Sequence, residues 1–335
     1  MGKIAFISEN GLVYCSPLII GLAAVAAILV YLGLLLRKEG SGLGAAISVL
    51  LSVLIGIPLA RLIHWYCQSG AYTGFWAAMT DYSSGQYALA GVFAGCMLGA
   101  VLTRLLGLHK DLPGMLDCMS LAGCVGIGLG RLSALFNSTD RAIMVVSEDV
   151  GFPFAYLLEN PVTGEVENRI ATFMLQSFAA WGILAALVGY MLWRRGKRIP
   201  GGHIALLFTL CYCASQIVLD STRYDALVLR SNGFVSMVQI LGCVGLLVPV
   251  AIFSGSYLRA GCKKGVGAAV WAAMACMLGL AGYMEYFVQN TREKAFLAYG
   301  IMTLAMGIVV ALTLLLRKMT MDKLEAALSA ADTND

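Results

Sequence analysis

Charged residues are scarce in this sequence, and their scarcity sets its class. Only 13% of the 335 residues are Asp, Glu, Lys or Arg, whereas a soluble domain carries about 25%. Hydrophobic residues make up 59%, and 38 glycines stand against 7 prolines. The shortage of charge excludes an ordinary soluble domain. The glycine content is typical of packed membrane helices, in which small residues let backbones approach closely.

Metal ligands and basic surfaces are poorly represented as well. Only three histidines are present, and most of the ten cysteines lie inside apolar runs. Cys211 and Cys213 are two residues apart, which on a helix points them to different faces, so we predict no metal site there. Lys and Arg number 23 against 19 Asp and Glu, and they lie at the ends of the apolar runs. No basic face is left for nucleic acid.

Long apolar runs dominate the chain. A helix needs about 20 mostly apolar residues to cross the hydrocarbon core of a bilayer. The runs that meet this requirement are 17–36, 44–66, 86–106, 114–135, 170–193, 202–220, 234–254, 265–287 and 298–316. The sequence therefore predicts an all-α polytopic membrane protein with about nine transmembrane helices.

The basic residues give an orientation for these spans. Clusters follow the first, third, fifth, seventh and ninth runs: Arg37 and Lys38; Arg104 and Lys110; Arg194, Arg195, Lys197 and Arg198; Arg259, Lys263 and Lys264; Arg317, Lys318 and Lys323. Basic residues are enriched in cytoplasmic loops. All five clusters share one side if the N-terminus lies outside and the C-terminus inside.

Polar side chains gather at the predicted outer ends of the spans. They are Arg61 and His64 in the second span, Arg131 in the fourth, Asn137, Asp140 and Arg141 beyond it, Arg169 at the start of the fifth, and Asp220 and Arg223 closing the sixth. Asp220 and Arg223, three residues apart, are expected on one helix face. Snorkelling or structural ion pairs explain a single arginine. Several arginines at one depth favour a phosphate ligand, which guanidinium groups match with paired donors. We expect an anionic phospholipid headgroup.

Small residues show one clear pattern. Gly91, Gly95 and Gly99 recur every four residues along the third span, which predicts a helix-packing seam. An outward-facing transporter is a weaker interpretation of the polar residues, since no pair of interrupted helices in matching halves is visible.

Short motifs then fall in a characteristic order between residues 12 and 255. They are ARLIH at 60–64, SGQYALAGVFAG at 84–95, Asp117, GLGRLSALFN at 128–137, ATFMLQS at 171–177, GGHIALLFTLCYCASQIVLDSTR at 201–223 and VSMVQIL at 235–241. Taken together they resemble the motifs of the bacterial prolipoprotein diacylglyceryl transferases.

Several positions depart from that family pattern. Leu89, Ala90 and Gly91 stand where the family has a histidine and two glycines, and Ala134 replaces the signature asparagine. Leu175 and Gln176 replace a Tyr-Glu pair, and Gln216 replaces an arginine. Asp220 is a shorter side chain than the acidic residue of the family, and Ile20 replaces a tyrosine. Arg61, Arg131, Asn137, Asp220 and Arg223 are retained, and Asp140 is similar to the glutamate that follows the signature, shifted by one. The phosphate-binding half of the family site is better kept than the proton-handling half.

The resemblance implies transfer of a diacylglyceryl group from phosphatidylglycerol to the lipobox cysteine of a prolipoprotein, without a cofactor. The place implied is the outer leaflet of the bacterial cytoplasmic membrane, in lipoprotein biosynthesis. Its partners would be a phosphatidylglycerol-like phospholipid and a lipoprotein signal peptide. The alternative is a non-catalytic relative that binds an anionic phospholipid or a lipoprotein precursor.

The same resemblance assigns expected roles and regions. The catalytic candidates are Arg131, Asp220, His64 and Asp140, and the substrate-binding candidates are Arg61, Arg223, Asn137, Gln176, Gln216 and Gly91. We expect a seven-helix core over 1–255 with an outer segment at 136–168, two additional membrane helices over 256–316, and a cytoplasmic tail over 317–335.

The orientation can be tested by single-cysteine labelling in a variant that lacks the native cysteines. In intact cells, an impermeant thiol reagent should label a cysteine placed at Asn160 and should fail to label one at Lys197. The basic clusters would hold Lys197 on the cytoplasmic side. The reverse labelling pattern would overturn the orientation.

Overall fold

The computed structural model describes residues 4–8, 11–39, 42–80, 87–136, 142, 144–159, 164–196, 199–223, 226–229, 232–291 and 294–332. The helices of the first half are α1 (Cys15–Glu39), α2 (Gly42–Cys67), α3 (Phe75–Thr80), α4 (Leu89–Leu105) and α5 (Leu112–Gly130). Those of the second half are α6 (Thr172–Trp193), α7 (His203–Ser221), α8 (Met237–Arg259), α9 (Lys264–Asn290) and α10 (Ala295–Asp332). The antiparallel hairpins are β1 (Ile4–Ser8) with β2 (Gly11–Tyr14), β3 (Ala155–Glu159) with β4 (Val166–Ile170), and β5 (Val228–Leu229) with β6 (Asn232–Ser236).

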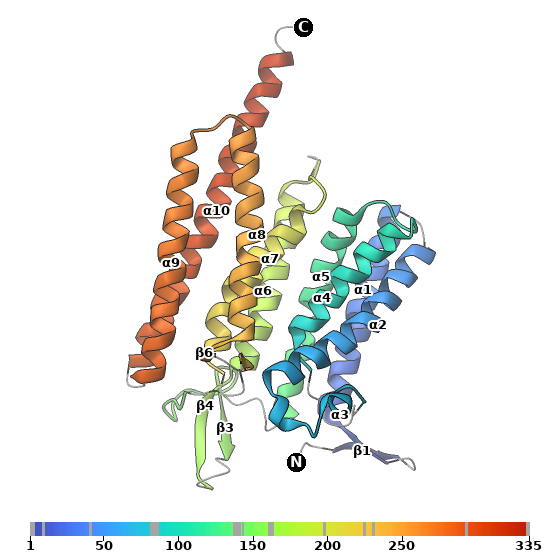
Figure 1. Cartoon of the computed structure of the whole chain (residues 1–335), viewed down its shortest axis with the longest axis vertical. Helices are drawn as coiled ribbons and strands as arrows, with labels where there is room; N and C mark the ends of the chain where they lie inside the picture. The colour runs from blue at the N-terminus through green and yellow to red at the C-terminus, as the bar shows by residue number, and fades with distance from the viewer. Residues whose placement is uncertain are drawn as a thin grey trace. The chain divides into compact units, whose positions relative to one another are not determined.

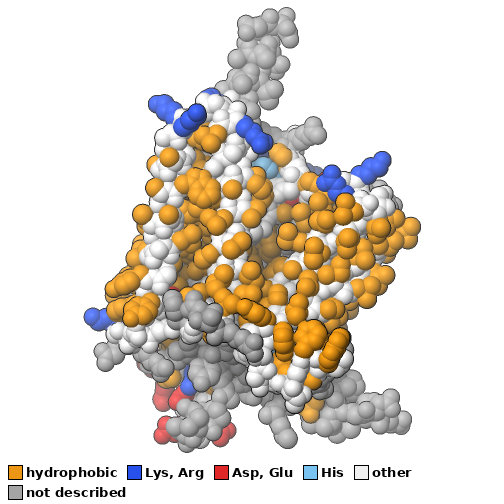
Figure 2. Space-filling model, viewed as in Figure 1, with side chains coloured by type: hydrophobic (Ala, Val, Ile, Leu, Met, Phe, Trp, Pro, Cys, Tyr) orange, Lys and Arg blue, Asp and Glu red, His pale blue; other side chains and the backbone are white. Residues whose placement is uncertain are grey.

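The predicted spans each coincide with a helix. Over the described residues, eight helices are long and apolar enough to cross a membrane. The remaining predicted span is α4, whose 17 residues lie at the short end of the spanning range of about 17–25 residues. Apolar side chains face outward, as at Leu29, 64% exposed, and Leu304, 66% exposed. They cover the flanks of the helices, with Lys and Arg at helix ends (Figure 2). Such an exterior fits lipid, and the protein is an all-α polytopic membrane protein.

Two compact units can be distinguished by their internal contacts. The first consists of residues 1–208 and 222–238, and the second of 209–221 and 239–335. The first unit therefore contains α1 to α6, the start of α7 and the three hairpins (Figure 1). The second contains the rest of α7, α8 from Gln239 onward, α9 and α10. The expected division at residues 255 and 256 stays a prediction.

Glycines hold α2 and α4 in close antiparallel contact in the first unit. A Cβ added at Gly91 would overlap the backbone of Ala60, and one at Gly95 would overlap that of Gly56. At Gly99 the added atom would lie 2.5 Å from Oγ of Ser52. The three glycines, taken in order along α4, thus face Ala60, Gly56 and Ser52, which are every fourth residue of α2. This confirms the packing seam that the sequence predicted.

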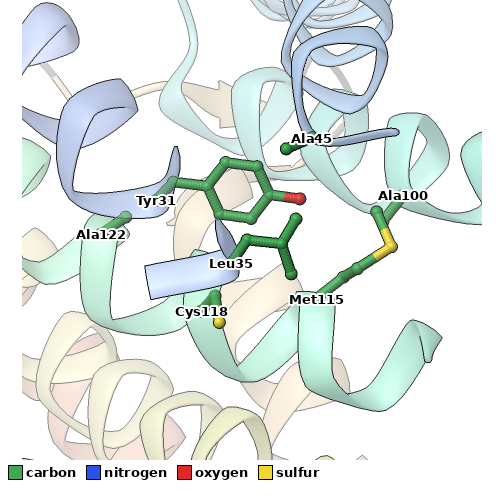
Figure 3. Packing of buried hydrophobic residues seen from close by; sticks show 7 residues of the cluster. All are labelled: Tyr31, Leu35, Ala45, Ala100, Met115, Cys118 and Ala122. Atoms are coloured by element: carbon green, nitrogen blue, oxygen red, sulfur yellow. The ribbon is translucent and has the colours of Figure 1, made fainter. Parts of the chain in front are cut away.

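A cluster of buried side chains joins α1, α2, α4 and α5 (Figure 3). Tyr31 of α1 lies among Leu35, Met115 and small residues of the neighbouring helices. Its hydroxyl makes a 2.9 Å hydrogen bond with Oγ of Ser48 on α2. The polar end of the ring is therefore satisfied inside an apolar cluster, as buried tyrosines require.

Two aspartates organise the end of the first unit at which α1 ends and α5 begins. Lys38 Nζ donates to Asp111 Oδ2 at 2.7 Å, and this hydrogen bond is the main cause that lowers the pKa of the Asp111 carboxyl. Asp117 accepts from the backbone N–H groups of Gly202 at 2.8 Å and Ala205 at 2.9 Å. A carboxylate at these otherwise unpaired donors stabilises the start of α7. Basic residues Arg37, Arg104 and Arg194 belong to the same end.

The opposite end of the first unit carries the three hairpins (Figure 1), and we call it the hairpin end. The predicted outer segment 136–168 contains β3 and most of β4. Asn168 of β4 donates to the carbonyls of Ser147 and Val150, each at 2.8 Å. These bonds fold the preceding loop onto the hairpin. Asn137, Asp140 and Arg141, and the labelling positions Asn160 and Lys197, lie outside the described residues.

In the second unit, α9 and α10 pack against each other and against α8. Tyr257, Val270 and Leu316, one from each helix, form a buried cluster. Lys323 Nζ donates to the carbonyl of Gly261 at 2.5 Å, where the φ of +71° lies in the left-handed region that favours glycine. The two helices after residue 255 are thus packed parts of a helical unit.

The glycine seam can be tested by adding single methyl groups. Gly95→Ala should reduce the stability of the purified protein by about 1–3 kcal/mol, because the Cβ forces α2 and α4 apart. Gly182→Ala is the control: it lies inside α6 with nothing within 4 Å of the added atom. We expect it to be neutral or to stabilise by roughly 0.5–1 kcal/mol. Thermal unfolding in detergent measures both, and equal effects would contradict the seam.

Candidate functional site

Arg61 is buried at the hairpin end of α2 and is surrounded by protein. Its side chain is 1% exposed. The Nε donates to the carbonyl of Ala78 at 2.8 Å, and the guanidinium lies over the rings of Tyr72 and Tyr87, at 5.2 and 5.3 Å from their centroids. Hydrogen bonding and cation–π contacts offset the cost of burying this charge. Arg61 thus anchors the connection between α2 and α4.

His64 lies one turn further along α2, where Tyr72 joins it to Arg61. The Tyr72 hydroxyl is 2.8 Å from His64 Nδ1 and accepts from Arg61 NH1 at 3.4 Å. Arginine can only donate, so the Tyr72 hydroxyl proton is available to His64 Nδ1. This geometry favours the neutral imidazole tautomer that carries its proton on Nε2. The structure brings two predicted site residues together through a tyrosine that the sequence analysis missed.

Tyr72 had no signal in the sequence. It lies in the connection between two spans, eight residues after His64, and no periodic pattern marks it. Only the return of the chain toward α2 places its hydroxyl beside the imidazole.

Arg131 begins a short 3-10 helix (Arg131–Phe136) that continues α5. Two contacts with α6 hold this segment. Ser177 Oγ donates to the carbonyl of Gly128 at 2.6 Å, one turn before Arg131, and Ala134 packs with Ala171 and Phe173. The half-buried Arg131 is therefore fixed against the first turns of α6.

Arg223 is fixed against the same turns by a different contact. Thr172 and Thr222 share a 2.7 Å hydrogen bond between their hydroxyls, and Arg223 follows Thr222 directly. The backbone of Arg223 also forms an antiparallel bridge with Ala142. Gln176, 1% exposed, lies on α6 between Thr172 and Ser177. Arg131, Gln176 and Arg223 therefore share one neighbourhood around the first two turns of α6, which we call the α6 cluster.

The expectation that Asp220 and Arg223 share a helix face is wrong. Helix α7 ends at Ser221, and Arg223 lies in extended backbone paired with Ala142. The chain leaves the helix before the arginine, so helical spacing does not relate the two side chains. Gln216 and Asp220 are both buried in α7, at 2% and 1% exposure, four residues apart and on one face.

The other arginine expected at this depth, Arg169, has a structural partner. It belongs to β4 and not to α6. Its Nε donates to Glu167 Oε2 at 2.8 Å, and its NH1 donates to the Ala142 carbonyl at 2.8 Å. Arg169 thus joins the hairpin to the segment that pairs with Arg223.

Among the remaining predicted residues, Gly91 packs on Ala60, the neighbour of Arg61. Asn137 and Asp140 lie outside the described residues. Within the described part of the chain, no group of three or more His, Cys, Asp or Glu side chains is placed to hold a metal ion. The arrangement offers what a phosphate-releasing transfer needs, namely arginines on rigid elements and a histidine with an adjacent hydroxyl.

Comparison with known proteins decides the family. The sequence model described as prolipoprotein diacylglyceryl transferase matches residues 11–254. The chain belongs to the prolipoprotein diacylglyceryl transferase family. It is also 27% identical over 204 residues to the phosphatidylglycerol–prolipoprotein diacylglyceryl transferase of Gloeobacter violaceus (strain ATCC 29082 / PCC 7421). That alignment covers 57% of this chain and 71% of the relative.

Membership of this transferase family makes diacylglyceryl transfer in lipoprotein biosynthesis the activity class of the protein. The family implies phospholipid and prolipoprotein substrates, and the helices make the protein multi-pass. The family match ends at residue 254, which leaves α9 and α10 outside it.

The α6 cluster can be tested by lipid binding. Arg131→Ala and Arg223→Ala should each weaken retention of an anionic phospholipid by about 1.5–3 kcal/mol, the value of a charge-assisted hydrogen bond. Arg195→Ala, an exposed arginine just beyond α6 at the opposite end of the unit, is the matched control and should not change retention. Quantifying lipid that remains bound after detergent exchange measures all three. Unchanged binding in both site variants, with the fold intact, would favour structural ion pairs with Asp140 and Asp220.

Proposed function

We propose that the protein transfers the diacylglyceryl group of phosphatidylglycerol to the lipobox cysteine of a prolipoprotein, at the outer leaflet of a bacterial cytoplasmic membrane. One observation carries the proposal. Arg131 and Arg223, which match arginines of the family motifs, belong to two segments that are bonded to the same two turns of α6, through Ser177 to Gly128 and through Thr172 to Thr222. Two guanidinium groups whose segments are fixed to one helix suit a single phosphate.

The reaction makes one bond and breaks one. The cysteine sulfur bonds to the glycerol carbon that carries the phosphate, the carbon–oxygen bond to the phosphate breaks, and glycerol phosphate leaves. Negative charge grows on the leaving phosphate, so positioned arginines favour the transition state over the ground state. We assign this role to Arg131 and Arg223, with Gln176 as a neutral neighbour that adds no repelling charge. Asn137 and Gln216 remain further proposed contacts to the substrate.

The thiol proton needs an acceptor, because the thiolate is the nucleophile. We assign the role of proton acceptor to the pair formed by Tyr72 and His64. The Tyr72 hydroxyl passes its proton to Nδ1 of His64 and receives the proton of the thiol, so the imidazole becomes cationic and Tyr72 is unchanged. The 2.8 Å contact between the hydroxyl and Nδ1 supports this route. Arg61 orients the hydroxyl from the other side.

Asp220 is the competing acceptor. It is the acid retained in the family motif, and its carboxylate is buried. In the proposed division of labour, Asp220 orients the substrate while His64 takes the proton. Asp140 is proposed for the same substrate-orienting role, at the position that follows the arginine signature.

A turnover assay separates these roles. Purified protein would be given phosphatidylglycerol and a lipobox peptide. His64→Gln and Tyr72→Phe should each lower turnover by about 10² or more, the contribution of a positioned proton acceptor. Asp220→Asn should lower it by roughly tenfold, the loss of a substrate hydrogen bond. His203→Gln, at the start of α7, is the matched control and should retain activity.

Two results would change the assignment. Loss confined to Asp220→Asn would make Asp220 the base and remove His64 from the reaction. No turnover by the parent, under conditions in which a transferase with the full family motifs works, would replace the catalytic proposal with lipid or precursor binding.

A further inference from the structure

A buried carboxylate lies outside the part of the chain that the family match covers. Glu285 is on α9, 31 residues past the end of the match at residue 254, and it is 6% exposed. Acidic side chains inside membrane helices are costly and mark functional positions more often than structural ones. Glu285 lies inside the predicted span 265–287, so the sequence alone places this charge within a membrane helix.

Both oxygens of Glu285 accept hydrogen bonds. Gln239 Nε2 donates to Oε2 at 2.8 Å, and Gln289 Nε2 donates to Oε1 at 3.2 Å. The same Gln239 Nε2 donates to the backbone carbonyl of Ile217 at 3.2 Å. Carbonyl oxygens can only accept, so the two contacts together fix which way the Gln239 amide points. Glu285 therefore acts on α7 through Gln239.

Tyr299 of α10 reaches the same turn of α7. Its hydroxyl donates to the carbonyl of Ser221 at 3.2 Å, and the ring is buried. Ser221 is the last residue of α7, and the final carbonyls of a helix have no partner within it. Tyr299 of α10 thus contacts the carbonyl of Ser221 directly, and Glu285 of α9 reaches the carbonyl of Ile217 through Gln239 of α8. The two carbonyls lie on either side of Asp220 in the sequence. All these residues belong to the second unit.

We infer that Glu285 and Tyr299 are positioning residues that hold the last turn of α7, and with it the Asp220 carboxylate, in the geometry used for diacylglyceryl transfer. The two helices added after the family match are then part of the reaction's machinery. The inference rests on the proposed function, because it takes Asp220 to act on the substrate. Glu285 acts through Gln239, and Tyr299 acts directly on the helix terminus.

The first arm of the test needs no activity. Amide hydrogen exchange of residues 216–223 would be compared between the full-length parent, Glu285→Gln and Tyr299→Phe. Both variants should exchange roughly tenfold faster over this turn, which is the loss of one hydrogen bond. Glu159→Gln on exposed β3 and Tyr283→Phe on the exposed side of α9 are matched controls and should exchange as the parent does. Unchanged protection in both site variants would overturn the inference, even if the parent is active.

The second arm uses turnover of phosphatidylglycerol and a lipobox peptide. Glu285→Gln should lower kcat about tenfold with KM for the lipid within about a factor of two, as expected for a group that acts on the transition-state geometry. In an Asp220→Asn background the same change should cost nothing further, because residues that act through one group are not additive. Additive losses would overturn the inference. A parent without turnover would contradict the proposed function, while the exchange arm still decides the positioning role.

Glu285→Gln keeps the shape of the side chain, so this variant alone still tests the inference if Tyr299→Phe fails to fold.

Glu285→Asp provides a rescue control. A shorter carboxylate that restores part of kcat, relative to Glu285→Gln, supports a positioning hydrogen bond to Gln239. Rescue of thermal stability without any rescue of kcat would show a purely structural role and overturn the inference.

Discussion

Hydrogen bonds from the first two turns of α6 hold the arginine-bearing segments of the first unit. Ser177 binds the carbonyl of Gly128, and Thr172 binds Thr222. Each bond lies within a few residues of an arginine that has no regular helix of its own at that point. Arg131 lies on a short 3-10 extension and Arg223 on an extended bridge, and both segments are bonded to α6 through hydroxyl groups that carry no charge.

The environment makes these small polar contacts valuable. Where lipid replaces water, a backbone or hydroxyl group that loses its partner inside the protein finds no other. The same reasoning applies at Arg61, whose Ala78 and tyrosine contacts hold the return of the chain from α2 to α4. The chain can return to α2 in this way because Gly91 of α4 packs directly on Ala60, the residue before Arg61. The glycine seam and the hydrogen bonds of Arg61 are thus coupled through two adjacent residues of α2.

The family resemblance predicts that Leu89 and Gln176 stand where the family has proton-handling residues, whereas Arg131 and Arg223 match family arginines. Outside the family match, α9 and α10 bring Glu285 and Tyr299 to the turn of α7 that carries Asp220. Polar groups that bind the end of a helix such as α7 can hold a side chain of a diverged site in a defined position.

The sequence by itself determined the helices, because apolar runs of spanning length have few other stable states in a membrane. It also determined the α2–α4 seam, since glycines every four residues define one face, and the motif order indicated the family. It could not determine where Arg223 lies, because helical spacing gave no sign that α7 ends at Ser221. Tyr72 and Tyr299 were equally invisible, since their contacts join residues 8 and 78 positions apart. Only tertiary structure decides such pairs: local periodicity fixes the face of a helix, whereas the partner of a hydroxyl or carboxylate depends on which distant segment packs against it.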